Sequence, residues 1–191
     1  MKRLRAVLIV AVGVVALAGM RWTIPRYDRI TGPIAFSGKP GEWVHADNLV
    51  VAAGPARLAR AIRFNTVGKP RVRSSGGVWL VIPVRSRVER TTGHLYGRTW
   101  VSADGRRYRA SSRAEEGVAV LSSTKTLQPG LERKDLLVFE LPTALAAGGG
   151  TLLLSEQGEP RLSAEAQVHY PALSVGSSID LLDLDALHAK L

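Results

Sequence analysis

Short apolar segments alternate with turn-forming residues along most of this 191-residue chain. Strands of about 5–8 residues, separated by turn signals roughly every 8–12 residues, are typical of an all-β sandwich or barrel. The apolar segments do not alternate with long amphipathic helices, which argues against a βαβ architecture. A chain of this length can bury a sizeable core without disulfides or metals. We therefore expect one all-β domain built as an antiparallel β-sandwich.

The clearest strand spans residues 78–88. Residues 78–84 are apolar at every position, which is typical of a strand covered on both faces. Because proline lacks a ladder donor, Pro83 predicts an edge position or a bulge. Residues 56–64 fit a strand or a helix, and residues 67–77, rich in Gly, Pro and Ser, predict a loop. Further strands are expected at residues 49–53, 96–101, 107–110, 136–141, 151–154 and 164–170.

The N-terminal segment carries a long apolar run. Lys2, Arg3 and Arg5 precede residues 6–20, which contain no polar side chain and must therefore leave water. A helix buried in a protein core does not need a basic cluster before it, whereas membrane anchors and signal peptides have one. We therefore expect residues 1–25 to be a membrane anchor or a signal peptide. Both place the N-terminus in the cytoplasm and residues 26–191 outside it.

Two interpretations of this segment remain open. As a single-pass anchor, the run approaches the roughly 20 residues of a membrane span once Leu4, Trp22 and Ile24 are added, and Arg21 extends its charge to the headgroups. As a cleaved signal peptide, the run ends in a small-residue site at residues 16–18, with cleavage near Ala18. We expect an anchor at the cell membrane, with secretion as the alternative.

The chain is basic, with 26 Lys and Arg against 16 Asp and Glu and a net charge of +10. No nucleic-acid-binding motif accompanies this charge, and the expected topology removes the domain from the cytoplasm, so we expect no nucleic-acid partner. Anionic lipid headgroups, envelope polymers or an acidic protein are the expected partners. The candidate basic surface consists of Arg57, Arg60, Arg63, Arg85, Arg87, Arg106, Arg107 and Arg109.

The sequence carries no catalytic or metal-binding motif. The absence of cysteine excludes disulfides, cysteine zinc sites and thiol nucleophiles. The acidic cluster at residues 180–185 lacks the glycine and the distal glutamate of an EF-hand loop. We expect no enzyme, no metal and no cofactor. The four histidines lie outside the GxSxG, HExxH and HxH patterns, at His45, His94, His169 and His188.

The C-terminal segment has a different pattern. A capping serine at residues 177–178 precedes leucines at helical spacing, which predicts a short amphipathic helix. This helix either covers an open end of the sandwich or docks onto a partner through Leu181, Leu184, Leu187 and Leu191. The chain is therefore divided into an anchor or signal segment (1–25), a linker (26–42), a β-sandwich (43–173) and an acidic amphipathic tail (174–191).

The order of five segments resembles a known family. These segments are 78–84 (VWLVIPV), 103–108 (ADGRRY), 127–130 (LQPG), 138–142 (VFELP) and 151–154 (TLLL). Their order resembles an actinobacterial-type family of membrane-anchored extracytoplasmic domains of unknown function, often called telomeric-repeat-binding-factor-like, whose fold is shared with a mycobacterial secreted immunoprotective antigen. The resemblance implies an immunoglobulin-like sandwich over roughly residues 43–170 and no catalytic site. Residues 87–90 (RVER) stand where the family has an Asn.

These observations favour a non-catalytic extracytoplasmic module, anchored to the cell membrane, that binds or scaffolds envelope proteins or polymers. The first alternative is a secreted binder of a small or lipidic ligand in the sandwich interior, formed by cleavage near Ala18. A hydrolase with a site that no motif reveals is the second alternative.

Overall fold

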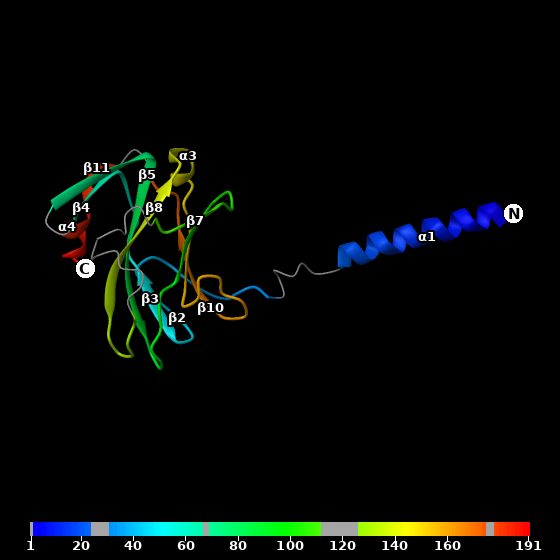
Figure 1. Cartoon of the computed structure of the whole chain (residues 1–191), viewed down its shortest axis with the longest axis horizontal. Coiled ribbons are helices and arrows are strands. Elements are labelled where there is room, and N and C mark those ends of the chain that lie inside the picture. The colour runs from blue at the N-terminus through cyan, green and yellow to red at the C-terminus, as the bar shows by residue number, and fades with distance from the viewer. Residues whose placement is uncertain (1, 24–30, 67–68, 112–125, 175–177) are drawn as a thin grey trace. The chain divides into compact units, whose positions relative to one another are not determined.

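The computed structural model contains two compact units, Met1–Gly32 and Pro33–Leu191. The first contains helix α1 (Lys2–Thr23), and the second contains all the strands of Figure 1. Since the second unit also contains both hydrophobic cores described below, it has what an independently folding domain requires. The structure describes residues 2–23, 31–66, 69–111, 126–174 and 178–191.

The second unit is a β-sandwich of two sheets, as expected. Two short helices, α3 (Thr143–Ala146) and α4 (Leu184–His188), follow strands β8 and β11. Sheet A has the order β1 (Ile34–Gly38), β10 (Ala164–Tyr170), β9 (Gly150–Ser155), β6 (Gly97–Ser102) and β7 (Arg107–Arg109). Sheet B has the order β11 (Ile179–Asp183), β4 (Arg57–Thr66), β5 (Lys69–Val88), β3 (Leu49–Ala53) and β2 (Trp43–Ala46), with β8 (Arg133–Leu141) paired to β5.

The main hydrophobic core contains side chains of both sheets. Trp100 of β6 and Phe139 of β8 are among its largest members and are fully buried. Along β5, alternate residues contribute to this core because side chains of a strand point to opposite faces. These residues are Val78, Leu80, Ile82 and Val84. Burial of this core is the principal stabilisation of the sandwich.

A second core covers the outer face of sheet B. Trp79 and Val81 of β5 point to this face, so β5 is buried on both sides, as its continuous apolar run predicts. Helix α4 covers the same face with Leu184 and Leu187. The other members are Ala59, Ile62, Phe64, Leu136, Val138 and Leu182.

Strand β5 is longer than the sequence predicts. The loop expected over residues 67–77 is wrong for residues 69–77, because residues 69–74 pair with β4 as a long hairpin. Pro83 is not at an edge, since it pairs with Leu136 of β8, and the register shift of β5 lies elsewhere, between Ser74 and Trp79. The carbonyl of Pro83 accepts a hydrogen bond from the N–H of Gly54 (2.7 Å), at the junction where β5 changes partner from β4 to β3. Because N and O of one strand residue point to the same side, the missing donor of Pro83 faces this junction.

The segment predicted as a linker contributes a strand to the sandwich. Strand β1 pairs in parallel with β10, from Ile34 opposite Ala164 to Gly38 opposite Val168. Phe36 also packs against the main core. The sandwich therefore begins before residue 43. The sequence did not predict this strand, because it has only five residues and the Gly, Lys and Pro residues on either side of it predict turns.

The C-terminal tail is also part of the sandwich. Residues 179–183, predicted as the beginning of a helix, form β11, which pairs in parallel with β4. The helix is limited to α4, whose N-cap Asp183 accepts a hydrogen bond from the N–H of Ala186. Tertiary pairing with β4 overrides the helical spacing of the leucines, since helix propensity in five residues is weak.

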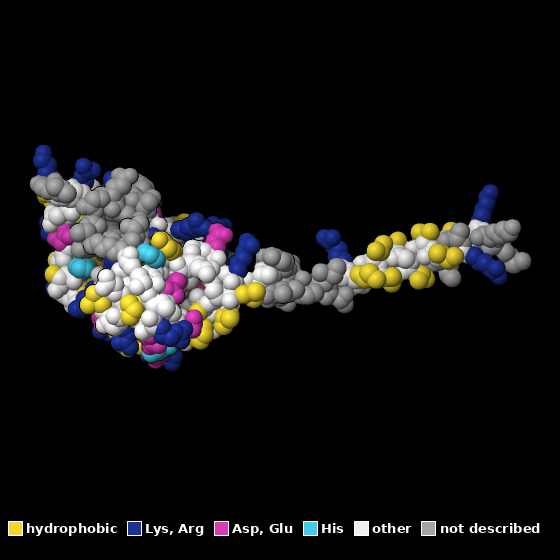
Figure 2. All heavy atoms as spheres, turned by 60° about the horizontal axis from the view of Figure 1, so that its bottom comes forward, with side chains coloured by type: hydrophobic (Ala, Val, Ile, Leu, Met, Phe, Trp, Pro, Cys, Tyr) yellow, Lys and Arg dark blue, Asp and Glu magenta, His cyan; other side chains and the backbone are white. Residues whose placement is uncertain are grey.

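Helix α1 occupies the predicted anchor segment. Figure 2 shows apolar side chains along its surface and basic side chains toward both of its ends. Its side chains from Ile9 to Trp22 are exposed within the unit. Judged by length and apolar character, no helix in the described ranges would cross a membrane. Residues 24–30, which include part of the predicted linker, lie outside the described residues.

Candidate functional site

The structure does not bring the eight predicted arginines together into one surface. Arg60 and Arg63 of β4 face the tail, where they form ion pairs with Asp180 and Asp183. Their charge is therefore used within the fold. The sequence could not reveal this pairing, because 120 residues separate each arginine from its partner.

A second group of arginines lies on sheet A. Arg106 and Arg109 belong to the β6–β7 hairpin and form ion pairs with Asp104 (3.2 Å) and Glu159 (2.7 Å). The Arg106–Asp104 pair stays within one turn, where the Oγ of Ser102 also donates to the Asp104 carboxylate. These bonds, led by the one from Ser102, lower the pKa of Asp104. Arg107 is exposed on β7.

The remaining three arginines, Arg57, Arg85 and Arg87, lie on the outer face of sheet B. The guanidinium carbons of Arg85 and Arg87 lie 4.7 and 5.0 Å from the ring centre of Trp43. Strand register explains this contact. Trp43 of β2 lies opposite Ala52 of β3, and Ala52 lies opposite Arg85 of β5, so all three share one face. The small side chain of Ala52 lets the long arginine reach the indole.

The uncharged indole of Trp43 holds both guanidinium groups in place. A guanidinium stacked on an indole gains about 0.5–1 kcal/mol at an exposed site and keeps its edge N–H groups available to an anion. Arg85 has a weak ion pair with Glu132 (3.7 Å). We name Trp43, Arg85 and Arg87 the tryptophan–arginine cluster. Trp43 is the one member of the cluster outside the predicted basic surface, and a period-2 alternation across β2 and β3 was the sequence signal for it.

A cavity of about 300 Å³ adjoins this cluster. It lies between the C-terminal segment and the junction of β3, β4 and β5. Its lining is mostly apolar, it has three cations and no Asp or Glu side chain, and it shares Arg85 with the cluster. We name it the junction cavity. Its lining residues are Gly41, Ala52, Ala53, Gly54, Pro55, Arg57, Pro83, Arg85, Leu187, Lys190 and Leu191.

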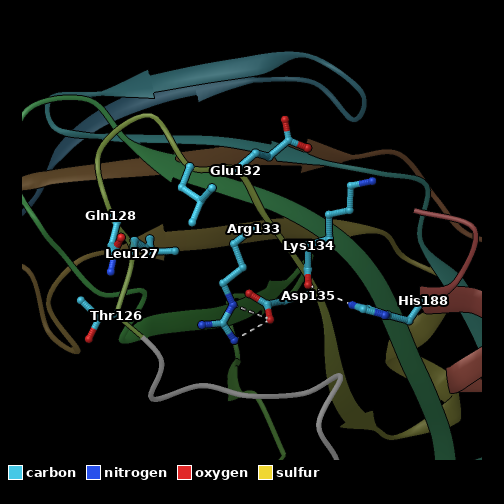
Figure 3. A pocket seen from close by; sticks show the side chains of 9 residues that line it. Thr126, Leu127, Gln128, Glu132, Arg133, Lys134, Asp135 and His188 are labelled. Carbon is cyan, nitrogen blue, oxygen red and sulfur yellow. Dashed lines mark hydrogen bonds and ion pairs between the residues drawn. The ribbon is translucent and has the colours of Figure 1, made fainter.

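A second cavity, also of about 300 Å³, lies beside the start of β8. Figure 3 shows Arg133 and Asp135 joined to each other by two hydrogen bonds, of 2.9 and 2.8 Å, to the same Asp135 oxygen. Both side chains are largely buried. His188 is bonded to the carbonyl of Lys134 (3.0 Å). Because the buried charges here neutralise each other, this cavity has less to offer a charged ligand than the junction cavity.

The third cavity, of about 440 Å³, is lined by Asp47, Leu162, Ile34 and their neighbours. Asp47 and Leu162 have positive φ angles of 58° and 50°, which are uncommon for residues with a side chain. The Asp47 carboxylate pairs with Arg90. Glu156, which also lines the cavity, accepts a hydrogen bond from the Asn48 amide. Acidic and apolar side chains thus share this lining, which points to no single ligand class.

Asn48 holds the loops beside this cavity. It is buried, and its Oδ1 accepts hydrogen bonds from the N–H groups of Arg90 (2.9 Å) and Thr91 (3.0 Å). Its Nδ2 donates to the carbonyl of Thr91 and to Glu156. The family that the sequence resembles has an asparagine directly after this strand. Here the backbone after β5 is also bonded by an asparagine, but this residue, Asn48, lies in the turn between β2 and β3. The turn dipeptide at residues 47–48 was the available sequence signal.

Each histidine has different partners in the part of the chain that the structure describes. His45 bonds to Glu89 (3.2 Å), and His94 stacks on Tyr96. His169 Nδ1 lies 2.9 Å from Thr151 Oγ1, a His–hydroxyl pair, but none of the hydrogen bonds described for it adds a carboxylate. No group of three or more potential metal ligands occurs among the described residues.

The two sheets are joined beside the junction cavity by Tyr170. Its hydroxyl donates to the carbonyl of Gly54 (2.8 Å), and burial raises the pKa of this hydroxyl far above its usual value. The tyrosine therefore remains a neutral donor. It fixes the backbone that forms one wall of the junction cavity.

No protein-family model matches the sequence, and no curated protein matches it. Among solved structures, the sandwich is similar to the yjhA protein from Bacillus subtilis, with 16% identity, a TM-score of 0.53 and coverage of 69% of this chain and 97% of that one. It also resembles an uncharacterized β-sandwich protein from Clostridium difficile (11%, 0.47, 72% and 95%) and the secreted protein MPT63 from Mycobacterium tuberculosis (15%, 0.49, 72% and 98%). The similarity to the yjhA protein, whose TM-score is above 0.5, supports the β-sandwich fold.

Proposed function

We propose that this chain is a non-catalytic, extracytoplasmic binding module. In this proposal, the outer face of sheet B engages an anionic partner of the cell envelope through the tryptophan–arginine cluster. The stacking of Arg85 and Arg87 on Trp43 carries the proposal. Four of the other six arginines of the predicted surface pair with carboxylates. In the cluster, Arg85 pairs with Glu132 (3.7 Å), and the indole orders both guanidinium groups without covering the edges that donate hydrogen bonds.

The location outside the cytoplasm is proposed from the N-terminal segment. Three basic residues followed by the apolar residues 6–20 favour export by α1, as a retained membrane attachment or as a signal cleaved near Ala18. Cell fractionation and N-terminal sequencing distinguish the two. A chain that begins at Met1 in the membrane fraction indicates retention, and one that begins at Gly19 outside the membrane indicates cleavage. A chain found only in the cytosol would contradict export.

The binding proposal is tested with the unit Pro33–Leu191 and two polyanions, polyphosphate and poly-glutamate. Binding is expected at low salt and should weaken steeply as salt rises, since released counterions and screening govern such contacts. Arg87→Gln and Trp43→Ala should each weaken binding about three- to fivefold, consistent with ion pairs and cation–π contacts at exposed sites.

Arg107→Gln is the matched control, because it removes the same charge from an exposed position on the other sheet. An equal loss in this control would mean that net charge, and not the cluster, determines binding. Binding that does not change with salt would contradict the polyanion proposal. Turnover of simple esters, peptides or glycans at enzyme-like rates would contradict the non-catalytic part.

The junction cavity favours the alternative of a small or lipidic ligand, although not in the sandwich interior. The space between the sheets is occupied by the side chains of the main core. A small ligand would therefore bind outside it, at the outer face of sheet B.

A further inference from the structure

We propose that the junction cavity binds a small anionic amphiphile, specifically the carboxylate of a medium-chain fatty acid. The headgroup would lie among Arg57, Arg85 and Lys190, and the first methylenes would lie against Pro83 and Leu187. This site shares Arg85 with the tryptophan–arginine cluster. Its ligand differs from the polyanion, since a concave, largely apolar cavity selects a different chemistry from that of an exposed cationic stack.

The charge of the lining points to an anion. Arg57, Arg85 and Lys190 all line the cavity, and no Asp or Glu side chain does. Arg57 and Lys190 are exposed and have no ion pair in the described ranges, while Arg85 reaches Glu132 only at 3.7 Å. Against these three cations stands at most one carboxylate, that of the Leu191 backbone, so the net charge of the lining is positive and concentrates anions there.

The remaining lining points to an apolar body attached to that anion. Pro83 is buried, and Pro55, Leu187 and Leu191 add hydrocarbon surface. A free inorganic anion would leave this surface wet, and a neutral hydrocarbon would leave the cations without a partner. A volume of about 300 Å³ is at the lower end of the range for small-molecule sites, so it fits a headgroup and a short stretch of chain.

The walls of the cavity are held in place before any ligand arrives. The backbone of Gly54 is fixed twice, by its N–H to the carbonyl of Pro83 (2.7 Å) and by its carbonyl to the hydroxyl of Tyr170 (2.8 Å). The N–H of Gly41 also donates to the carbonyl of Ala53 (2.7 Å). A preorganised wall reduces the entropic cost of binding.

Calorimetry of the unit Pro33–Leu191 with decanoate tests the inference. We expect saturable binding at one site, and hexanoate should bind more weakly, by about fourfold for each methylene that the cavity encloses. Decanol should bind at least tenfold more weakly, because it lacks the charge. Decyltrimethylammonium should not compete. Equal binding of decanoate and decanol, or no dependence on chain length, would overturn the inference.

Variants assign the binding to this cavity. The double variant Arg57→Gln/Lys190→Gln should weaken decanoate binding at least tenfold, and Arg107→Gln should leave it unchanged. Ala52→Leu should block the chain while all three cations remain, and its melting curve verifies that it folds. Unchanged binding in the double variant would place decanoate elsewhere and contradict the inference.

Arg87→Gln separates the two proposals. It belongs to the tryptophan–arginine cluster but does not line the cavity. It should weaken polyanion binding and leave decanoate binding intact. If the unit Pro33–Leu191 without substitutions bound decanoate but no polyanion at any salt concentration, the proposed function alone would be refuted. If it bound polyanions but not decanoate, the cavity ligand alone would be refuted.

Discussion

At the residue scale, burial and hydrogen bonding of a few polar side chains determine how the loops are arranged. Asn48 is the clearest case, because both ends of its amide are used in a site almost without solvent access. A buried group deprived of its partner costs about 1–3 kcal/mol. The loop beside β5 therefore depends on one side chain contributed by a distant turn.

Asn48→Ala should destabilise the sandwich by about 2–4 kcal/mol, because it leaves the N–H groups of Arg90 and Thr91 unpaired. At about 2–4 °C per kcal/mol for a domain of this size, the melting temperature should fall by roughly 4–16 °C. Asn65→Ala, at an exposed position of β4, is the matched control and should have little effect. Equal melting temperatures for the two variants would show that the bonds of Asn48 contribute nothing to stability.

At the element scale, the tail packs onto the sandwich through most of its leucines. Of the four predicted docking leucines, Leu184 and Leu187 are buried in the second core and Leu191 packs against it. Only Leu181 is substantially exposed, at 44%. The tail closes the part of the outer face of sheet B over β4, β5 and β8, and it also supplies Leu187 and Lys190 to the junction cavity.

Leu184→Ala should therefore cost about 2–5 kcal/mol, as expected for truncation of a buried leucine. Leu181→Ala, in the same segment, should cost less than about 1 kcal/mol, because this side chain already contacts solvent. Urea denaturation of both variants measures the difference. A docking role for the tail would reverse the pattern and leave Leu184→Ala close to the parent protein in stability.

The attachment of the tail should depend on pH through Asp183. Hydrogen bonds from the N–H of Ala186 and from Arg63 hold the pKa of its carboxyl below the usual value. A depressed pKa in the folded state stabilises the fold above the usual pKa of about 4 and loses this effect as the pH falls through the folded value. Asp183→Asn should melt below the parent protein at pH 7, and this difference should shrink below about pH 4. A difference that stays constant from pH 7 to pH 3 would contradict the role of the charge.

Sequence patterns predict the strands that have strong internal alternation, and they fail where pairing with distant residues decides the structure. Residues 78–88 and 136–141 are predicted as strands because their apolar side chains recur on one face of the strand or occupy both faces. β1 and β11 were not predicted, because each is short and gains its strand form from parallel pairing with a distant strand. The same limit applies to the site, since Trp43 and Arg85 meet only through the register of three strands.

At the scale of the whole molecule, the two misread elements show where the folding unit begins and ends. β1 covers the edge of β10 and adds Phe36 to the main core, whereas β11 and α4 close the second core. The parallel pairing of β1 with β10 connects the start of the unit to its C-terminal part, and that of β11 with β4 connects its end to its N-terminal part. The sandwich is thus completed by its terminal segments, and trimming to the apparent strands removes parts of both cores.

The unit Pro33–Leu191 should therefore unfold cooperatively at about the same temperature as the full chain, because it holds all the described strands and both cores. A chain of residues 43–173, the domain that the sequence suggests, lacks β1, β11 and α4. It exposes Trp79, Phe64 and Val81, so it should bind a dye for exposed apolar surface and lose its sharp thermal transition. Restoring residues 174–191 should recover the second core but leave the edge of β10 uncovered, giving an intermediate melting temperature. If the short chain melted as sharply and as high as Pro33–Leu191, the terminal strands would be attached to the sandwich without stabilising it.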